Sequence, residues 1–264
     1  MGSQARKKSQ QKQIVLSLLK NEGSVKTGDV ASILNVSECT VRRLFDELEM
    51  SGEVARKYGG INLVQKNPLD YYFEKLQQQQ TEQKERIGKY ASTMVESGDN
   101  VWIDSGTTSE QMAKHLLERI KHRRVANVQI FSNSHRNIDM FVDYCEVNLI
   151  GGLFRKSRQD YCGYLTEMVL DTISFDKAFL GADGISPNIE EGIMTMDVFS
   201  AKICNSVIKR SNSAYLLIDS TKLSRRSLIK FATLDQITDI ITDNEASEEE
   251  LDRIRTVGTR IVAV

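Results

Sequence analysis

The chain has 264 residues, with 35 lysines and arginines against 36 aspartates and glutamates, so its formal charge at pH 7 is −1. This balance excludes a histone-like basic protein, and 40% hydrophobic residues are ordinary for a soluble globular protein. The sequence has no apolar run of about 18–20 residues, which excludes a membrane helix. The length exceeds the usual range for one domain, which indicates two.

The N-terminal residues and the cysteines indicate the compartment. Residues 1–13 are polar and basic, unlike a secretory signal. The four cysteines are widely spaced and form no CxxC pair, which is typical of reduced thiols rather than of a disulfide framework or a zinc site. We therefore expect a cytoplasmic protein with no metal site and no membrane contact.

The charge is divided unevenly between the two sides of Pro68. Residues 1–66 carry 11 basic and 7 acidic residues, a net charge of +4, whereas the remainder carries −5. A basic segment favours nucleic acid because it neutralises phosphates. A net charge of +4 also fits a solvated terminus, so the residue pattern has to decide.

Three apolar patterns of helical spacing occupy the first 50 residues. One lies at about 9–21, the second begins at an expected N-cap at Thr27, and the third begins at an expected N-cap at Ser37. Two short strand-like runs around Gly59-Gly60 then predict a β-hairpin. The residues expected to face inward are Ile14, Val15, Leu18 and Leu19, then Val30, Ile33 and Leu34, then Val41, Leu44, Phe45 and Leu48.

Two short helices with a tight turn, followed by a hairpin, are typical of a winged helix-turn-helix, whose second helix enters the major groove of DNA. A lone arginine pair is more often a solvated helix face, but here it coincides with three helices, a cap and a wing. We therefore predict that the DNA-binding residues are Ser37, Glu38, Thr40, Arg42, Arg43, Arg56 and Lys57.

This stretch resembles the winged helix-turn-helix of the DeoR family of bacterial sugar-catabolism regulators. The resemblance lies in Val36-Ser37-Glu38-x-Thr40-Val41-Arg42-Arg43, in Leu48-Glu49 and in Arg56-x-x-Gly59-Gly60. The family usually has an aspartate directly after the two arginines. This chain has Leu44 there and an acid at Asp46, which alters how the arginines are held.

Asn67-Pro68 ends the strand pattern, and helix formers follow from Asp70. We expect a hinge at Pro68 and then one long helix. Residues 67–83 would form a linker helix between a DNA-binding domain at 9–66 and an effector-sensing domain at 84–264. The aromatic run Tyr71-Tyr72-Phe73 is either a small apolar anchor or a contact with a partner subunit.

Seven short apolar runs alternate with helical patterns in the second domain, at residues 101–104, 128–132, 147–150, 178–181, 214–219, 239–242 and 260–264. They lack the alternation of half-buried strands. The pattern therefore predicts an α/β fold in three layers around a mainly parallel sheet. Ligands of such sheets bind at the carboxyl ends of the strands.

Polar residues follow several of these runs. Asp104-Ser105-Gly106-Thr107-Thr108 opens a helix, where free N–H groups favour an anion; the alternative is a plain capping box, Thr107-x-x-Glu110. Other strand ends carry Ser132-Asn133, Gly151-Gly152 with Arg155 nearby, Gly181-Ala182-Asp183-Gly184 and Asp219-Ser220-Thr221-Lys222. Such clustering predicts a small-molecule site, with Lys222 placed for a phosphate.

These residues also resemble the DeoR-type sensor domain, which carries the same motifs in the same order and is similar in fold to ribose-5-phosphate isomerase. With the first domain, the resemblance covers nearly all of the chain. It implies that Ser105, Gly106, Thr107, Thr108 and Lys222 hold a phosphate, and that Asn133, Asp104, Asp183 and Lys202 lie near the sugar. The acids common before Lys202 in the family are reduced here to Asp197.

An isomerase-like domain could turn over its ligand, with Asp183 as base and Lys202 polarising a carbonyl. No second acid adjoins Asp183, and the three histidines lie in surface or capping contexts. We therefore expect no catalytic residue and no cofactor. A DNA-binding scaffold that senses nothing is a further alternative, which the phosphate loop and Lys222 disfavour.

We predict a repressor of a sugar or carbon-catabolism operon. It would bind double-stranded operator DNA as a homo-oligomer, a dimer or a tetramer, because one short helix per groove gives limited specificity. A phosphorylated sugar or related metabolite in the second domain would shift the DNA-competent population. The helix after Pro68 would carry the change.

Overall fold

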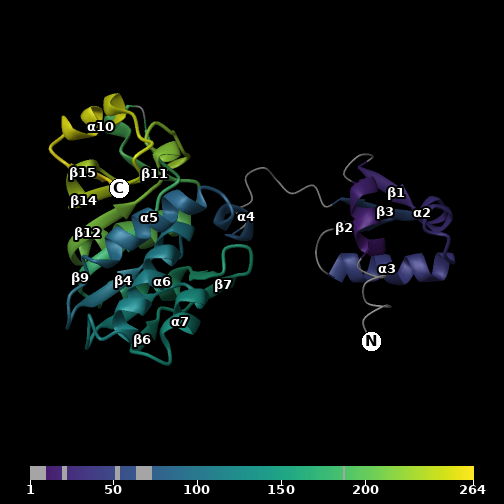
Figure 1. The fold of residues 1–264 in the computed structure, drawn as a ribbon, viewed down its shortest axis with the longest axis horizontal. Coiled ribbons are helices and arrows are strands. Elements are labelled where there is room, and N and C mark those ends of the chain that lie inside the picture. Colours follow the sequence, from purple (N-terminus) through teal and green to yellow (C-terminus); the bar gives the residue numbers. More distant parts are fainter. Residues whose placement is uncertain (1–9, 20–22, 51–53, 64–72, 187) are drawn as a thin grey trace. The chain divides into compact units, whose positions relative to one another are not determined.

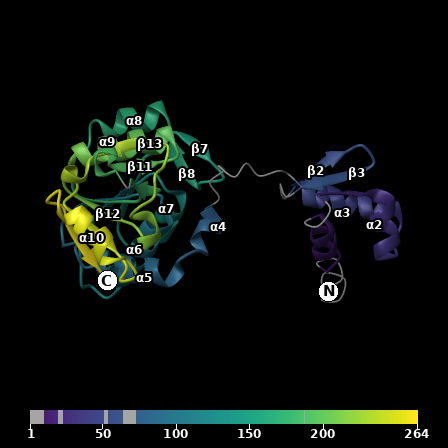
Figure 2. The same cartoon turned by 90° about the horizontal axis from the view of Figure 1, so that it is seen from above.

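The computed structural model describes residues 10–19, 23–50, 54–63, 73–186 and 188–264. Its contacts divide the chain into a unit of residues 1–70 and a unit of residues 71–264, here called the N-terminal and C-terminal units (Figures 1 and 2). Pro68, Tyr71 and Tyr72, on which part of the linker prediction rests, lie outside the described residues. In the part of the chain that is described, no helix is long and apolar enough to cross a membrane.

The N-terminal unit packs helices against a small antiparallel sheet. Residues 10–19 are helical, and β1 (Ser24–Lys26), α2 (Thr27–Leu34), α3 (Glu38–Met50), β2 (Val54–Lys57) and β3 (Gly60–Leu63) follow. The strand order is β1-β3-β2. Apolar side chains from all three helices and from the sheet share one core. The predicted winged helix-turn-helix is confirmed, with one addition: β1 is too short to show a period in the sequence.

Two expected details of α2 are wrong. Thr27 does not cap the helix, because its buried Oγ1 donates to the carbonyl oxygen of Gly59, 3.1 Å away, and ties the helix to the wing. Ile33 is 55% exposed rather than inside. The inward face of α2 follows Thr27, Val30 and Leu34, at spacings of three and four residues, and Ile33 lies off this face.

A seven-stranded parallel sheet forms the centre of the C-terminal unit, in the order β15-β14-β12-β9-β4-β5-β6. Each predicted run overlaps one of these strands, so the mainly parallel sheet is confirmed. The strands are β4 (Asn100–Ile103), β5 (Gln129–Ser132), β6 (Glu146–Leu149), β9 (Phe175–Leu180), β12 (Ser211–Leu217), β14 (Asp239–Thr242) and β15 (Arg260–Ala263).

Helices cover both faces of this sheet, which confirms the three layers (Figures 1 and 2). One apolar core holds residues of α5 (Thr81–Ser92), α6 (Thr107–Lys121) and α7 (His135–Phe141). The other holds residues of α8 (Tyr164–Leu170), α9 (Val198–Lys209) and α10 (Glu248–Arg255). Side chains of β4 alternate between the cores: Val101 and Ile103 enter the first, and Trp102 enters the second.

Several short elements that were not predicted lie outside the seven-stranded parallel sheet. β7 (Leu153–Arg155) and β8 (Asp160–Cys162) form an antiparallel hairpin. β10 (Gly184–Ile185), β11 (Ile193–Thr195) and β13 (Ile229–Ala232) form a separate antiparallel sheet. Three 3₁₀ turns, η1 (Ile189–Glu191), η2 (Ser220–Lys222) and η3 (Leu234–Gln236), complete the unit.

The expected single long helix after Pro68 is wrong. α4 (Phe73–Gln77) and α5 are separate helices, because Gln80 between them adopts a left-handed conformation with φ of 51°. Both belong to the C-terminal unit. The Phe73 ring is buried and lies 4.9 Å from the guanidinium of Arg136, so this aromatic residue is an anchor within its own unit.

The strand order reverses between β4 and β9. From this point β5 and β6 extend to one side, and β12, β14 and β15 extend to the other. The connections after β4 and β9 lead to helices on opposite faces, α6 and α9. Such a reversal opens a crevice at the carboxyl ends of the two strands, which is where ligands of open α/β sheets bind.

Candidate functional site

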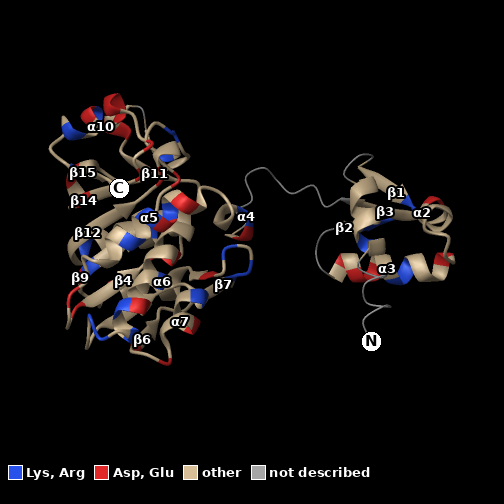
Figure 3. Cartoon of the chain, in the orientation of Figure 1, with Lys and Arg blue, Asp and Glu red and all other residues tan. Residues whose placement is uncertain are grey.

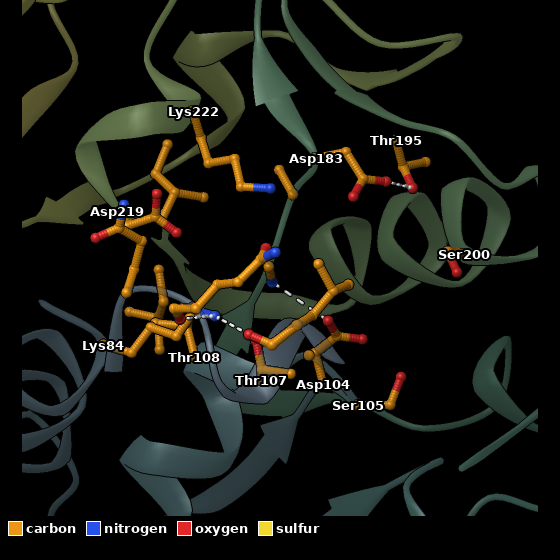
Figure 4. A pocket seen from close by; sticks show the side chains of 18 of the residues that line it. Lys84, Asp104, Ser105, Thr107, Thr108, Asp183, Thr195, Ser200, Asp219 and Lys222 are labelled. Carbon is orange, nitrogen blue, oxygen red and sulfur yellow. Dashed lines mark hydrogen bonds between the residues drawn. The ribbon is translucent and has the colours of Figure 1, made fainter. Parts of the chain in front are cut away.

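A cavity of about 240 Å³ lies at this crevice (Figure 4). It brings together residues that follow β4, β9 and β12, and the first turn of α6 forms part of its wall. The predicted residues that line it are Asp104, Ser105, Gly106, Thr107, Thr108, Asp183, Asp219 and Lys222.

The first turn of α6 is not closed by a capping box, so that alternative is wrong. Gly106 is at the N-cap and makes no side-chain cap bond. Glu110 points elsewhere: it accepts from Arg136 at 2.8 Å and from Gln77 at 2.7 Å. The N–H groups of this turn therefore receive no cap from the Thr107-x-x-Glu110 motif, and the N-terminus of a helix favours an anion.

Asp104 ends β4 at the base of the cavity. Burial raises the pKa of its carboxyl to about 6, and the nearby Asp160 contributes in the same direction. Hydrogen bonds from the backbone N–H groups of Ser105 and Gly181 oppose the rise in pKa; the bond from Gly181 is 3.3 Å long. The carboxyl thus changes its charge close to neutral pH.

Two more carboxylates are held in fixed positions. Asp183 Oδ2 accepts from Thr195 Oγ1 at 2.9 Å and from the N–H of Met196 at 2.8 Å. Asp219 is buried and accepts from the Thr221 hydroxyl. Figure 4 shows the Lys222 amine reaching from the neighbouring turn toward the middle of the cavity. Carboxylates of this kind can accept from ligand hydroxyls, and the lysine can meet an anion.

The sequence interpretation missed three cations of the lining, Lys84, Arg158 and Arg225. With Lys222 they make four cations against the three carboxylates, so the lining is net positive inside an acidic unit. No feature of the sequence marked Lys84 as a cavity residue, because a lysine on an amphipathic helix normally faces solvent. Thr195 and Ser200, also missed, are polar residues at strand and helix ends, which could have signalled them.

Six predicted effector residues do not line the cavity, and two of these belong to the segment after β5. Ser132 is buried and its Oγ donates to the carbonyl oxygen of Ile103 at 2.6 Å, which ties β5 to β4. Asn133 donates from Nδ2 to the carbonyl oxygen of Tyr161 at 2.9 Å. Their polar groups serve strand connections instead.

The other four predicted effector residues also lie outside the cavity lining. Gly152 allows a close approach, since a Cβ there would stand 2.4 Å from the hydroxyl of Thr166, and that hydroxyl donates to the carbonyl oxygen of Gly151 at 2.7 Å. Arg155 is held between Asp160 at 2.7 Å and Asp197 at 2.6 Å. Lys202 lies on the exposed side of α9, where it pairs with Glu167 at 3.2 Å.

The start of α3 carries the predicted DNA-binding residues. Ser37 Oγ accepts from the N–H of Thr40 at 3.3 Å, as expected of an N-cap. Glu38, Thr40, Arg42 and Arg43 are exposed. Arg42 pairs with Glu38 at 3.1 Å, and Figure 3 shows basic and acidic residues together on this helix.

Arg56 of the wing, one of the predicted DNA-binding residues, makes its contacts within the N-terminal unit. It forms an ion pair with Asp46, lies 3.6 Å from Glu49, and donates to the carbonyl oxygen of Arg42 at 3.0 Å. Asp46, the displaced acid of the family pattern, therefore braces the wing against α3. Lys57 remains exposed near the wing tip.

A chain that combines a winged helix-turn-helix with a second unit containing a net positive cavity has the organisation of a ligand-responsive DNA-binding regulator. Comparison with known proteins gives the family. The DeoR-like helix-turn-helix domain matches residues 11–67, and the DeoR C terminal sensor domain matches residues 79–244. The chain belongs to the DeoR family of transcriptional regulators.

Similar proteins include repressors and a sugar-phosphate enzyme. The HTH-type transcriptional regulator IolR of Bacillus subtilis is 29% identical, over 87% of this chain and 88% of its own. The lactose phosphotransferase system repressor of Streptococcus mutans is 30% identical, over 90% and 92%. A solved D-ribose-5-phosphate isomerase in complex with phospho-erythronic acid matches with a TM-score of 0.41 and 17% identity, over 54% and 53% of the two chains. This last likeness is too distant to transfer a residue role.

Proposed function

We propose that this regulator represses a sugar or carbon-catabolism operon, and that its effector is a phosphorylated sugar or related metabolite held in the cavity. One observation carries the proposal: the uncapped N-terminus of α6 and the amine of Lys222 border one cavity whose lining is net positive. The names of relatives such as the lactose phosphotransferase system repressor support the sugar class.

The lining divides into an anionic and a hydroxyl-binding part. The first turn of α6 and Lys222 supply donors for a phosphate, whereas Asp183 and Asp219 supply acceptors for sugar hydroxyls. At about 240 Å³ the cavity is smaller than the roughly 300–1,000 Å³ of pockets for drug-sized ligands. The size therefore fits a small metabolite.

A thermal-shift screen of phosphorylated and unphosphorylated sugars tests this, because a ligand that binds only the folded state raises apparent stability. We expect a response to one or more phosphorylated sugars and none to their unphosphorylated forms. Lys222→Met should abolish the response, whereas Lys202→Met should keep it, because Lys202 lies outside the cavity. Equal responses of the two variants would refute the assignment.

The isomerase alternative loses its catalytic pair. It required Asp183 and Lys202 to act on one ligand, and only Asp183 lines the cavity. We propose that the bound sugar phosphate is sensed and not turned over. Conversion of any sugar phosphate by the purified protein, abolished in Asp183→Asn, would restore the enzyme interpretation.

For the DNA contact we propose the exposed start of α3, namely Ser37, Glu38, Thr40, Arg42 and Arg43, together with Lys57 of the wing. Duplexes selected from a random-sequence library provide the binding probe. Arg43→Ala should weaken binding and reduce the salt slope by about 1, as expected for one lost phosphate contact. Arg210→Ala, an exposed arginine of the C-terminal unit, should leave both unchanged.

We further propose a homo-oligomer, formed through the face of α8 and the adjoining strands. These elements carry seven large apolar side chains, each 41–75% exposed: Leu149, Leu153, Phe154, Tyr164, Leu165, Met168 and Val169. Together they expose roughly 600 Å², against the about 800 Å² that each partner contributes to a standard interface. Glu167, the charged residue of α8, is paired with Lys202 at 3.2 Å, so α8 itself places no unpaired charge on this face.

A second copy is the proposed occupant, because winged helices of this type bind paired half-sites as dimers. Leu165→Glu should lower the oligomeric state in sedimentation velocity. Val257→Glu, beside β15 at the opposite edge of the sheet, should leave it unchanged. A wild-type monomer at all concentrations would refute the proposal.

A further inference from the structure

The short helix α4 connects the DNA-binding unit to the cavity. It is the first described element after residues 64–72, through which the chain passes from one unit to the other. Its residue Leu76 and the turn residues Gln79 and Gln80 line the cavity. A change in the position of α4 therefore alters both the wall of the cavity and the point at which the chain leaves the C-terminal unit.

Lys84, in the first turns of α5, holds the end of α4. Its Nζ donates to the carbonyl oxygen of Leu76 at 2.6 Å and to that of Gln79 at 2.7 Å. The side chain lines the cavity, the residue is only 5% exposed, and Figure 4 shows it beside Thr107 and Thr108. An ammonium group has three N–H donors. The two bonds to described residues leave one donor for a ligand.

The electrostatics of Lys84 favour an anionic ligand. Burial lowers the pKa of its amine; the nearby Asp219 opposes this, and the positive charge of Lys222 adds to it. Two amines thus border one cavity, and the positive charge of Lys222 disfavours the charged form of Lys84. An anion between them would offset both the lost hydration and this repulsion.

A second tether of α4 leads to the same place. Gln77 donates from Nε2 to Glu110 Oε2 at 2.7 Å, and Glu110 lies in the first turns of α6, whose N-terminus borders the cavity. Gln77 itself does not line the cavity. The anion site and the docking site of α4 therefore share the same end of α6.

We propose that Lys84 is an effector-binding residue that bridges the anionic group of the effector and the last carbonyls of α4. Effector occupancy and the docking of α4 are thereby coupled, so the ligand fixes the helix that leads to the DNA-binding unit. This inference rests on the proposed anion site. Coupling between two binding events is reciprocal, so loosening α4 must also weaken the ligand.

Amide hydrogen exchange of the full-length protein, with and without inorganic phosphate at constant ionic strength, tests the bridge. In the wild type, phosphate should slow exchange both at residues 107–110 and at residues 73–80. Lys84→Met should weaken phosphate binding about tenfold or more. In this variant, saturating phosphate should slow exchange only at residues 107–110. Lys89→Met, an exposed lysine of the same helix, should behave as the wild type.

Gln77→Ala provides a second route that leaves Lys84 in place. It loosens α4 without touching the cavity, so phosphate should bind at least twofold more weakly than to the wild type. Unchanged affinity in this variant, or protection of residues 107–110 without residues 73–80 in the wild type, overturns the coupling and leaves the anion site standing. Absence of protection at both places overturns the anion site and the coupling with it.

Discussion

Asp104 gives a prediction that can be worked through in numbers. Its carboxyl has a pKa of about 6 in the folded protein against an ordinary value of 3.8. The folded state therefore binds more protons than the unfolded state, and the stability from this group is present below about pH 4 and is lost as the pH rises through 6. Asp104→Asn removes this loss, because the amide does not ionise and its oxygen still accepts from Gly181.

The size of the effect follows from the two pKa values. One pKa unit corresponds to about 1.4 kcal/mol, so the ionised carboxylate lowers the free energy of unfolding by about 3 kcal/mol at pH 7.5. At pH 4 the same group contributes only about 0.5 kcal/mol. The variant should therefore be more stable than the wild type at pH 7.5 and close to it at pH 4.

Urea denaturation followed by tryptophan fluorescence measures this difference. Trp102 is the only tryptophan and is fully buried in the C-terminal unit, so the signal reports that unit alone. Asp171→Asn, at an exposed position, serves as the control and should show the same difference from the wild type at both pH values. If the Asp104→Asn difference is equally independent of pH, burial of Asp104 has been misjudged and the reasoning fails.

Three further substitutions test ion pairing and packing. Arg155→Met should lower the free energy of unfolding by about 3–5 kcal/mol, because it removes the cation 2.7 Å from the buried Asp160 and, among the described residues, leaves only Arg158, 3.9 Å away. Removing the exposed ion pairs of Arg255 should leave the denaturation midpoint unchanged. In the N-terminal unit, Gly60→Ala should cost about 1–3 kcal/mol and speed amide exchange in β3, since the added Cβ would stand 2.0 Å from a carbonyl oxygen of β1. Gly28→Ala, inside α2, should instead stabilise by about 0.5–1 kcal/mol, because the added Cβ would meet only Glu38 Oε1 at an ordinary contact distance of 3.8 Å. Faster exchange in both glycine variants would contradict this account.

The near-zero charge of the whole chain conceals two surfaces with different tasks. The basic residues of the first unit include the exposed Arg42 and Arg43 at the start of α3, which suits phosphates along DNA. The acidic second unit concentrates four cations around one cavity, which suits a much smaller anion. The charge pattern along the chain thus agrees with the two ligands that we propose.

Local chemistry was enough to predict the elements and part of the cavity. Continuous apolar runs marked all seven parallel strands, since a strand covered on both faces needs apolar side chains on both. The loop at Asp104–Thr108 was predictable because it follows a strand directly, and the carboxyl ends of parallel strands share one edge of the sheet.

The sequence by itself thus determined the two units, the winged helix, the parallel sheet and the strand-end loops, because all of these depend on residues close together in the chain. Only the tertiary structure decided which polar residues meet. It pairs Arg155 and Lys202 with carboxylates outside the cavity lining, and it buries Lys84 next to the cavity. The physical reason is that a charged side chain takes whichever partner the packing of distant elements brings within reach, and helix periodicity contains no information about that partner.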